Sequence, residues 1–208
     1  MATNELPPPQ QPAPSLGSDP RSTPEAPAAP APAAPLGRFD LSTFAPSWGA
    51  SVMGTSALSV ALLVVGEGTS AAGVTQAAAR FILVVAVIVG ALILGATAAR
   101  WIRYPAQARA DLRHPIKGGM TATAAGSLLT MAVAIGKVGP GFLPEALIEP
   151  AVVVLAVLGA LLALLIGWEF LGEVFTSTDP ALAQMSGAWF VPPVVTIVVP
   201  LALLPIIT

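Results

Sequence analysis

The sequence predicts an all-α integral membrane protein with five transmembrane helices. Of its 208 residues, 55% are hydrophobic and only 10% are charged, and the mean hydropathy is +0.80. Soluble domains carry about a quarter of their residues as charged side chains, whereas uncharged apolar runs of about 20 residues are long enough to cross a bilayer. Five such runs follow a stretch rich in Pro and Ala. We therefore expect a polar tail followed by a multi-pass membrane domain.

The tail is expected to cover residues 1–38, which hold eleven of the 22 prolines. This composition cannot bury enough apolar surface to offset the entropy lost on ordering, so we expect a disordered, partly polyproline segment. It lacks the basic start and the apolar core of a signal peptide. The first apolar run is therefore expected to insert as a true span.

The membrane domain is expected to cover residues 39–208. Cytoplasmic loops are enriched in Lys and Arg, and five of the nine basic residues join the second span to the third. These five are Arg100, Arg103, Arg109, Arg113 and Lys117. We expect this segment and the tail on the cytoplasmic side of the plasma membrane, with the basic segment on anionic lipid. The spans are predicted at about residues 44–65, 81–101, 118–136, 150–170 and 189–208.

The first and third spans carry hydroxyl groups at a spacing of four residues. The first span has Ser51, Thr55 and Ser59 in this spacing, and the third has Thr123 and Ser127. On a helix, every fourth residue forms a slowly drifting stripe along one side. The second span has one hydroxyl near its end, and the fourth has none. The stripes predict either a polar path through the membrane or close packing of helices through small residues.

The fifth span is rich in proline. Pro192 and Pro193 open it, where the missing N–H costs little, and Pro200 lies further inside, where it removes a backbone hydrogen bond. We expect Pro192, Pro193 and Pro200 to kink this helix and to free carbonyl groups near Thr196, which is a further lining candidate. Irregular backbone at membrane depth is tolerated where it lines a cavity or is buried in protein. A kink that serves packing alone is the alternative.

No acidic or basic side chain lies in the middle of any span. Intramembrane ionisable groups usually mark proton relays or coupling-ion sites. An anion here would be handled by hydroxyls, backbone N–H groups and helix dipoles. The chain has no Cys, one His and none of the P-loop, G-x-S-x-G or H-E-x-x-H motifs, and its net charge is −2. We expect no enzymatic activity, no metal or other cofactor, and no nucleic-acid partner.

Three motifs resemble those of one transporter family, in the right order and spacing. They are Phe44-x-Pro46-x-Trp48 with Val52-Met53-Gly54-Thr55, Asp111-Leu112-Arg113-His114-Pro115, and Trp189-Phe190-Val191-Pro192-Pro193. They resemble the tellurite-resistance/dicarboxylate transporter family, which includes plant slow anion channels, bacterial tellurite-resistance proteins, fungal malate permeases and sulfite exporters. The resemblance covers about residues 38–208.

The resemblance implies a fold of ten transmembrane helices, built as five hairpins around a quasi-five-fold axis. Odd-numbered helices would line a central pore, and even-numbered helices would form an outer ring. This chain would supply only the first five helices, so we expect the N-terminal half of such a protein, truncated after the fifth span. The pore-occluding Phe of the family lies in a later helix, so neither Phe44 nor Phe190 is assigned that role. The resemblance also implies a homotrimer.

The expected function is transport of a small anion through a pore lined by the odd-numbered helices. The resemblance implies an anion of the C4-dicarboxylate, sulfite, tellurite or halide/nitrate class. A proton-coupled C4-dicarboxylate carrier is one alternative, and a non-transporting membrane subunit or an inert truncated product is the other. The candidate lining residues are Ser51, Thr55, Ser59, Thr123, Ser127 and Thr196.

Overall fold

The computed structural model describes residues 40–114, 116–176 and 187–207. The chain divides into two units, residues 1–38 and 39–208, and the description below concerns the second unit. The tail that the sequence predicts to be disordered lies outside the described residues.

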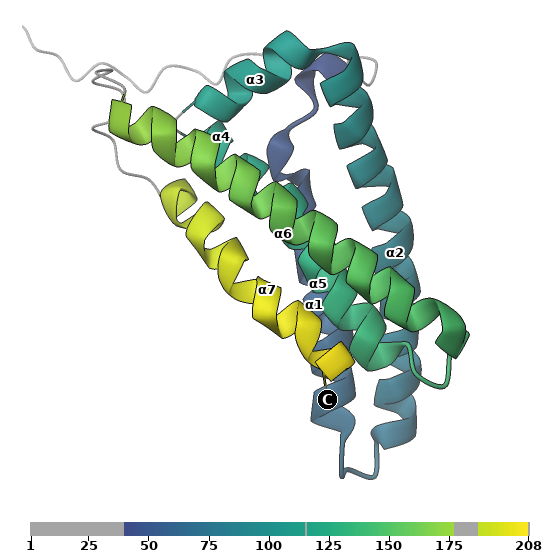
Figure 1. The fold of residues 1–208 in the computed structure, drawn as a ribbon. Coiled ribbons are helices and arrows are strands. Elements are labelled where there is room, and N and C mark those ends of the chain that lie inside the picture. Colours follow the sequence, from purple (N-terminus) through teal and green to yellow (C-terminus); the bar gives the residue numbers. More distant parts are fainter. Residues whose placement is uncertain (1–39, 115, 177–186, 208) are drawn as a thin grey trace, which may run out of the picture. The chain divides into compact units, whose positions relative to one another are not determined.

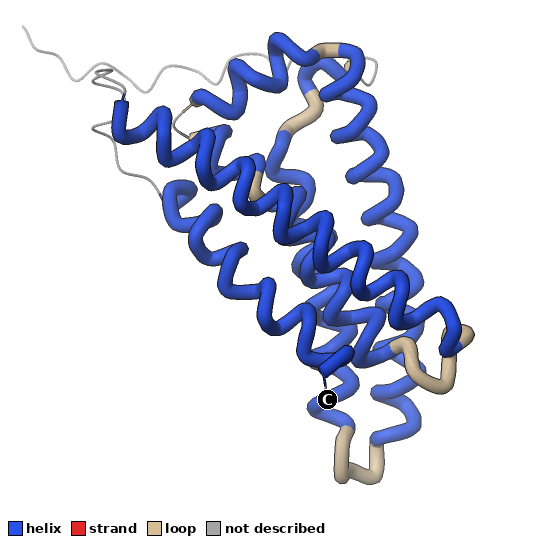
Figure 2. The backbone as a smooth tube through the Cα atoms, viewed as in Figure 1, coloured by secondary structure: helices blue, strands red, loops and turns tan. Residues whose placement is uncertain are grey.

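Every element in the described part of the chain is a helix (Figures 1 and 2). Short 3-10 helices precede α1 and α7. These are η1 (Leu41–Thr43), η2 (Pro46–Trp48) and η4 (Gly187–Phe190). The α-helices are α1 (Gly49–Gly66), α2 (Ala72–Arg103), α3 (Pro105–Arg113), α4 (Lys117–Thr121), α5 (Thr123–Val138), α6 (Glu145–Thr176) and α7 (Val191–Ile207).

Four helical stretches are long and apolar enough to cross a membrane. They are Pro46–Gly66, Ala72–Arg103, Lys117–Val138 and Glu145–Glu173. The apolar stretch in α7, Val191–Leu204, is shorter. The prediction of an all-α membrane protein is thereby confirmed.

Two helices begin earlier than the sequence suggested. α2 begins nine residues before the predicted start at residue 81, because residues 72–80 are rich in Ala and continue the helix beyond the most apolar run. α6 begins at Glu145, five residues before Pro150, so that Pro150 lies inside the helix. An acidic residue in the first turn complements the helix dipole. Hydropathy therefore located the most apolar parts of these helices and missed the helical extensions beside them.

The predicted third span consists of two helices, because the chain turns at Ala122 between α4 and α5. The Ala122 N–H bonds to the Gly119 carbonyl oxygen at 3.2 Å, a tighter turn than an α-helix makes. α4 packs closely against its neighbours at Gly118. A side chain there would meet the carbonyl oxygen of Leu112 and the ring of Phe170. This turn anchors the start of the span against α3 and α6.

α5 is the central helix of the unit, and 83% of the apolar window within Lys117–Val138, the stretch that comprises α4 and α5, is buried. It packs against α1, α2, α6 and α7. α1 pairs with α2, α5 pairs with α6, and α7 runs alongside α6 (Figure 1). The turns that close the two hairpins contain Gly68 and Gly141, whose φ angles of 73° and 69° favour glycine. α5 thus contacts both α1 and α7, while α2 packs on α1 and α6 packs on α7.

Candidate functional site

The exposed face of α1 is made mainly of small side chains. The buried face of this helix holds Gly49, Val52, Ser56, Ser59 and Gly66 and packs on α2 and α5. Leu58 is the one large side chain in the middle of the opposite face, and Val64 and Val65 lie at its end. The small residues exposed on that face are Ala50, Ser51, Gly54, Ala57 and Ala61.

The exposed faces of α2 and α6 differ sharply from that of α1. On α2, Phe81 and Leu92 are 67% and 69% exposed, and on α6, Leu161 and Leu164 are 54% and 64% exposed. Large aliphatic and aromatic side chains suit contact with lipid tails, whereas small residues leave space or allow another helix to approach. The exposed face of α1 therefore suits an open space or a neighbouring helix better than contact with lipid tails.

The predicted hydroxyl stripe of α1 crosses from this exposed face to the buried one. Four residues advance a helix by about 400°, so each step turns the stripe by about 40°. Ser51 is exposed, Thr55 is half-buried and Ser59 is fully buried. Each hydroxyl donates a hydrogen bond to a carbonyl oxygen of its own chain: Ser51 to Trp48 at 2.7 Å, Thr55 to Ser51 at 2.9 Å, and Ser59 to Ser56 at 2.7 Å.

The hydroxyls of Thr123 and Ser127 lie buried where α5 meets the start of α1. The Thr123 hydroxyl is 3.0 Å from the carbonyl oxygen of Pro46, and the Ser127 hydroxyl is 2.9 Å from that of Gly49. Each also reaches a carbonyl three or four residues earlier in the chain, at Met120 and Thr123 respectively, and its single hydrogen can serve one acceptor at a time. These contacts show close packing of α1 on α5. The lining role of Thr123 and Ser127 stays a prediction.

Gly49 makes this close packing feasible. A Cβ at this position would lie 2.7 Å from both the carbonyl carbon and the carbonyl oxygen of Thr123. Both are backbone atoms, so the contact could be relieved only by moving α1 away from α5. Periodicity in the sequence could not identify Thr123 as the neighbour of this glycine.

α7 continues as one helix through the three predicted kink sites, Pro192, Pro193 and Pro200. Pro192 is buried, and Pro193 and Pro200 are exposed. The Thr196 side chain is half-buried, and its hydroxyl donates to the Pro193 carbonyl oxygen at 2.7 Å. The kinks and the lining role of Thr196 stay predictions.

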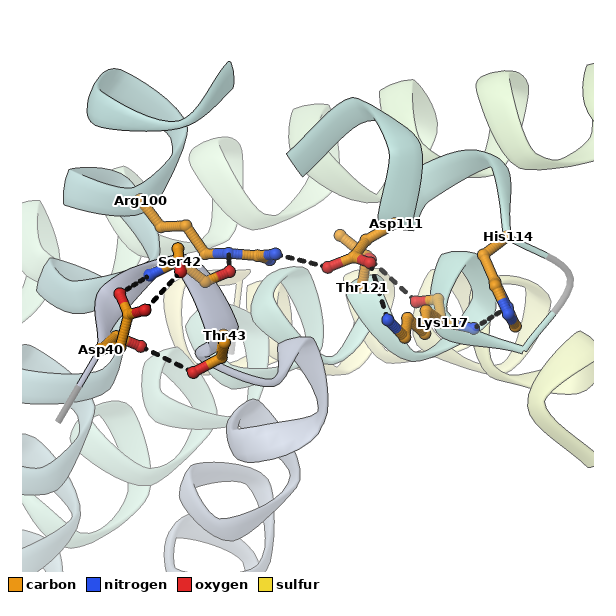
Figure 3. Close-up of polar contacts among 8 residues, drawn as sticks. All are labelled: Asp40, Ser42, Thr43, Arg100, Asp111, His114, Lys117 and Thr121. Carbon is orange, nitrogen blue, oxygen red and sulfur yellow. Dashed lines mark hydrogen bonds and ion pairs between the residues drawn. The ribbon is translucent and has the colours of Figure 1, made fainter. Parts of the chain in front are cut away.

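A polar network joins the end of α2 to α3 and α4, and Figure 3 shows Asp111 between Arg100 and Lys117. One oxygen of Asp111 accepts from the buried Arg100 guanidinium, and the other accepts from Lys117 Nζ at 3.0 Å. Arg100 Nε also donates to the Ser42 carbonyl oxygen at 3.3 Å, and His114 Nδ1 accepts from the Ile116 N–H at 3.2 Å. The sequence assigned the basic residues here to lipid and missed Asp111 as their partner.

The environment of Asp111 favours its charged form. Burial raises the pKa of this carboxyl, but hydrogen bonds from Arg100 and Lys117 and the charges of these two residues hold it below its usual value. A cavity of about 560 Å³ opens beside the network. It is lined by all three of these residues and by Ser47 and Met120, at the approach to α1 and α4.

Comparison with protein-family models gives a match over residues 43–208, to the model described as voltage-dependent anion channel. Comparison with curated proteins and with solved structures gives no match. The family match agrees with the resemblance read from the sequence motifs. Within the described residues, no cluster of His, Asp and Glu could hold a metal ion. Together with its apolar helices, the match shows that this multi-pass membrane chain belongs to the voltage-dependent anion channel family.

Proposed function

We propose that the chain carries a small anion across the plasma membrane along the exposed face of α1. One observation supports this above all: α1 exposes small and hydroxyl-bearing residues, whereas α2 and α6 expose large aliphatic ones. A helix that lines a pathway must leave room for the anion and offer it weak polar contacts. A helix that faces lipid needs neither property.

The lining residues under this proposal are Ser51, Thr55 and Thr196, whose side chains are exposed or half-buried. In the structure, their hydroxyls donate to backbone carbonyls, and rotation about the C–O bond would turn the same hydrogen towards a passing anion. Such contacts are weak because the donors are neutral. Weak contacts suit rapid passage better than tight capture.

Ser59, Thr123 and Ser127 have a different part in the proposal. All three are buried, and Thr123 and Ser127 reach carbonyls at the start of α1. Thr123 and Ser127 set the distance between α1 and α5, which in turn sets the width of the pathway, so their effect on transport is indirect. The Ser59 hydroxyl bonds to Ser56 within α1, and Ser59 is assigned no part in transport.

The cavity beside the polar network would form the mouth of the pathway. The lining of this cavity has a formal charge of +1, from Arg100, Lys117 and Asp111. A positive cleft raises the local concentration of anions. Because basic residues favour the cytoplasmic side, the mouth and the tail are placed there. Further helices packed on α1 and α7 would close the pathway, and the homotrimer implied by the resemblance is a second, separate level of assembly.

Flux measurements on purified protein in liposomes test this assignment, with chloride, malate, sulfite and tellurite as candidate ions. Ser51→Ala and Thr55→Val remove one hydroxyl each and should change the flux by about two- to tenfold, the range expected for one hydrogen bond of about 0.5–1.5 kcal/mol. Ser59→Ala is the matched control, because it removes a hydroxyl of the same stripe from the buried face. Equal effects of all three substitutions would contradict the proposed lining.

The same liposomes distinguish a channel from a proton-coupled carrier. A carrier should concentrate C4-dicarboxylate when a pH gradient is imposed, whereas a channel should follow the anion gradient and the voltage. The absence of ionisable side chains from the middle of the spans favours the channel. Folded protein that carries none of the four ions would instead support a non-transporting subunit.

A further inference from the structure

A second cavity, of about 720 Å³, lies between α2, α3, α5 and α6. α2 and α6 both pack on α5, and α3 contacts both α2 and α6 (Figure 1). The cavity is therefore bordered by two helices whose exposed faces carry large aliphatic side chains. Its size is in the range of small-molecule sites, about 300–1,000 Å³.

The lining of this cavity changes along the helices from aliphatic to charged. Leu94 and Leu162 line it at one level of α2 and α6, and Trp101 and Glu169 line it seven residues further along. Seven residues of helix span about 10 Å. Trp favours the boundary between lipid tails and water, so the charged level corresponds to the headgroup region.

Two arginines of α3, Arg109 and Arg113, complete the charged level. They are four residues apart, so they share one face of the helix. Both are exposed, and neither makes an ion pair with any residue in the described ranges. With Glu169 they give the cavity a formal charge of +1.

We propose that this cavity binds one glycerophospholipid with a single net negative charge, such as phosphatidylglycerol. Its phosphodiester would pair with Arg109 and Arg113, and part of one acyl chain would lie along the leucines below them. Glu169 could accept a hydrogen bond from a headgroup hydroxyl and disfavours lipids with more negative charge. Basic pockets between transmembrane helices suit anionic headgroups. Along the cavity, leucines are followed by Trp101 and then by the two arginines, which is the order in which a lipid presents its acyl chain, its interfacial region and its phosphate.

Native mass spectrometry of the purified full chain, in an equal mixture of phosphatidylglycerol and phosphatidylcholine, tests the proposal. The unmodified chain should retain phosphatidylglycerol in preference. Each basic residue at an anionic lipid contributes about fivefold, so Arg109→Gln with Arg113→Gln should lower the preference by about 25-fold. Arg103→Gln is the matched control, because this exposed arginine ends α2 and lies outside the cavity lining. It should leave the preference almost unchanged.

A second variant tests the acyl part of the site without changing charge. Ala98→Trp places a large side chain into the exposed part of the lining and should reduce retention of both lipids. Circular dichroism checks that each variant keeps its helix content. The proposal is overturned if folded Arg109→Gln/Arg113→Gln protein retains the preference, or if Arg103→Gln loses as much. A disulfide between two copies of an Ala98→Cys chain would assign the cavity to a protein interface instead.

Discussion

Replacement of Gly49 by Ala perturbs the contact that holds α1 against α5. The new Cβ would stand 2.7 Å from two backbone atoms of Thr123, about 0.7 Å closer than ordinary van der Waals contact allows. If α1 shifts by that amount, the Ser127 hydroxyl moves from 2.9 Å to about 3.6 Å from the Gly49 carbonyl oxygen, beyond hydrogen-bonding range. The substitution therefore combines a steric clash with the loss of an interhelical hydrogen bond.

The expected size of the effect follows from these two contributions. Overpacking costs about 1–3 kcal/mol, and an interhelical hydrogen bond in a membrane contributes about 0.6 kcal/mol. The free energy of unfolding should fall by about 1.6–3.6 kcal/mol. For a protein of this length, that corresponds to a decrease in Tm of about 3–14 °C.

Gly54→Ala is the matched control on the same helix. A Cβ at Gly54 meets nothing within 4 Å, and the exchange of Gly for Ala favours the helix by about 1 kcal/mol. Thermal unfolding in detergent, followed by circular dichroism, compares the two variants. A Gly49→Ala protein as stable as the Gly54→Ala protein would refute the close approach of α1 to α5.

Two further predictions concern polar side chains at helix contacts. Ser56→Ala should leave Tm unchanged or raise it, because the buried Ser56 hydroxyl oxygen has no hydrogen-bond partner among the described residues. Ser127→Ala should lower the free energy of unfolding by about 0.6 kcal/mol, because it removes a hydrogen bond between α5 and α1. The reverse order of stability in the same unfolding assay would contradict these placements. Because the pKa of Asp111 is lowered in the folded state, its carboxylate stabilises the fold at pH values above the usual pKa of Asp. This stabilisation is lost as the pH falls through the lower pKa of the folded state. The unmodified chain should therefore lose stability below about pH 4 more steeply than Asp111→Asn, and parallel pH profiles would refute the role of Asp111.

The sequence correctly predicted an all-α membrane protein, because long apolar runs have few alternative explanations. It placed the starts of α2 and α6 too late, since the helical extensions at residues 72–80 and 145–149 are less apolar than the spans. The break at Ala122 was also missed. It depends on a tight turn and on the approach of Gly118 to α3 and α6, which a periodic pattern does not encode.

At the candidate site too, the periodic pattern of hydroxyl residues predicted only part of the arrangement. The spacing of Ser51, Thr55 and Ser59 predicted one side of a helix, but the drift of the stripe takes Ser59 to the buried face. Thr123 and Ser127 have the same spacing and lie against the start of α1. Periodicity reveals which residues share a helix face, while the neighbours of that face are fixed by tertiary packing.

The most direct test of the central claim is the accessibility of single cysteines, which the absence of native Cys makes straightforward. Ser51→Cys lies on the exposed face of α1, and Leu92→Cys lies on the face of α2 that carries large exposed aliphatic side chains. A membrane-impermeant, negatively charged methanethiosulfonate reacts with thiolates, which form in water and are suppressed in lipid. The account predicts that Ser51→Cys is modified, that its anion flux falls and that a transported anion slows the reaction, while Leu92→Cys stays unmodified. An unreactive Ser51→Cys, or equal reaction at both positions, would contradict an anion pathway along α1.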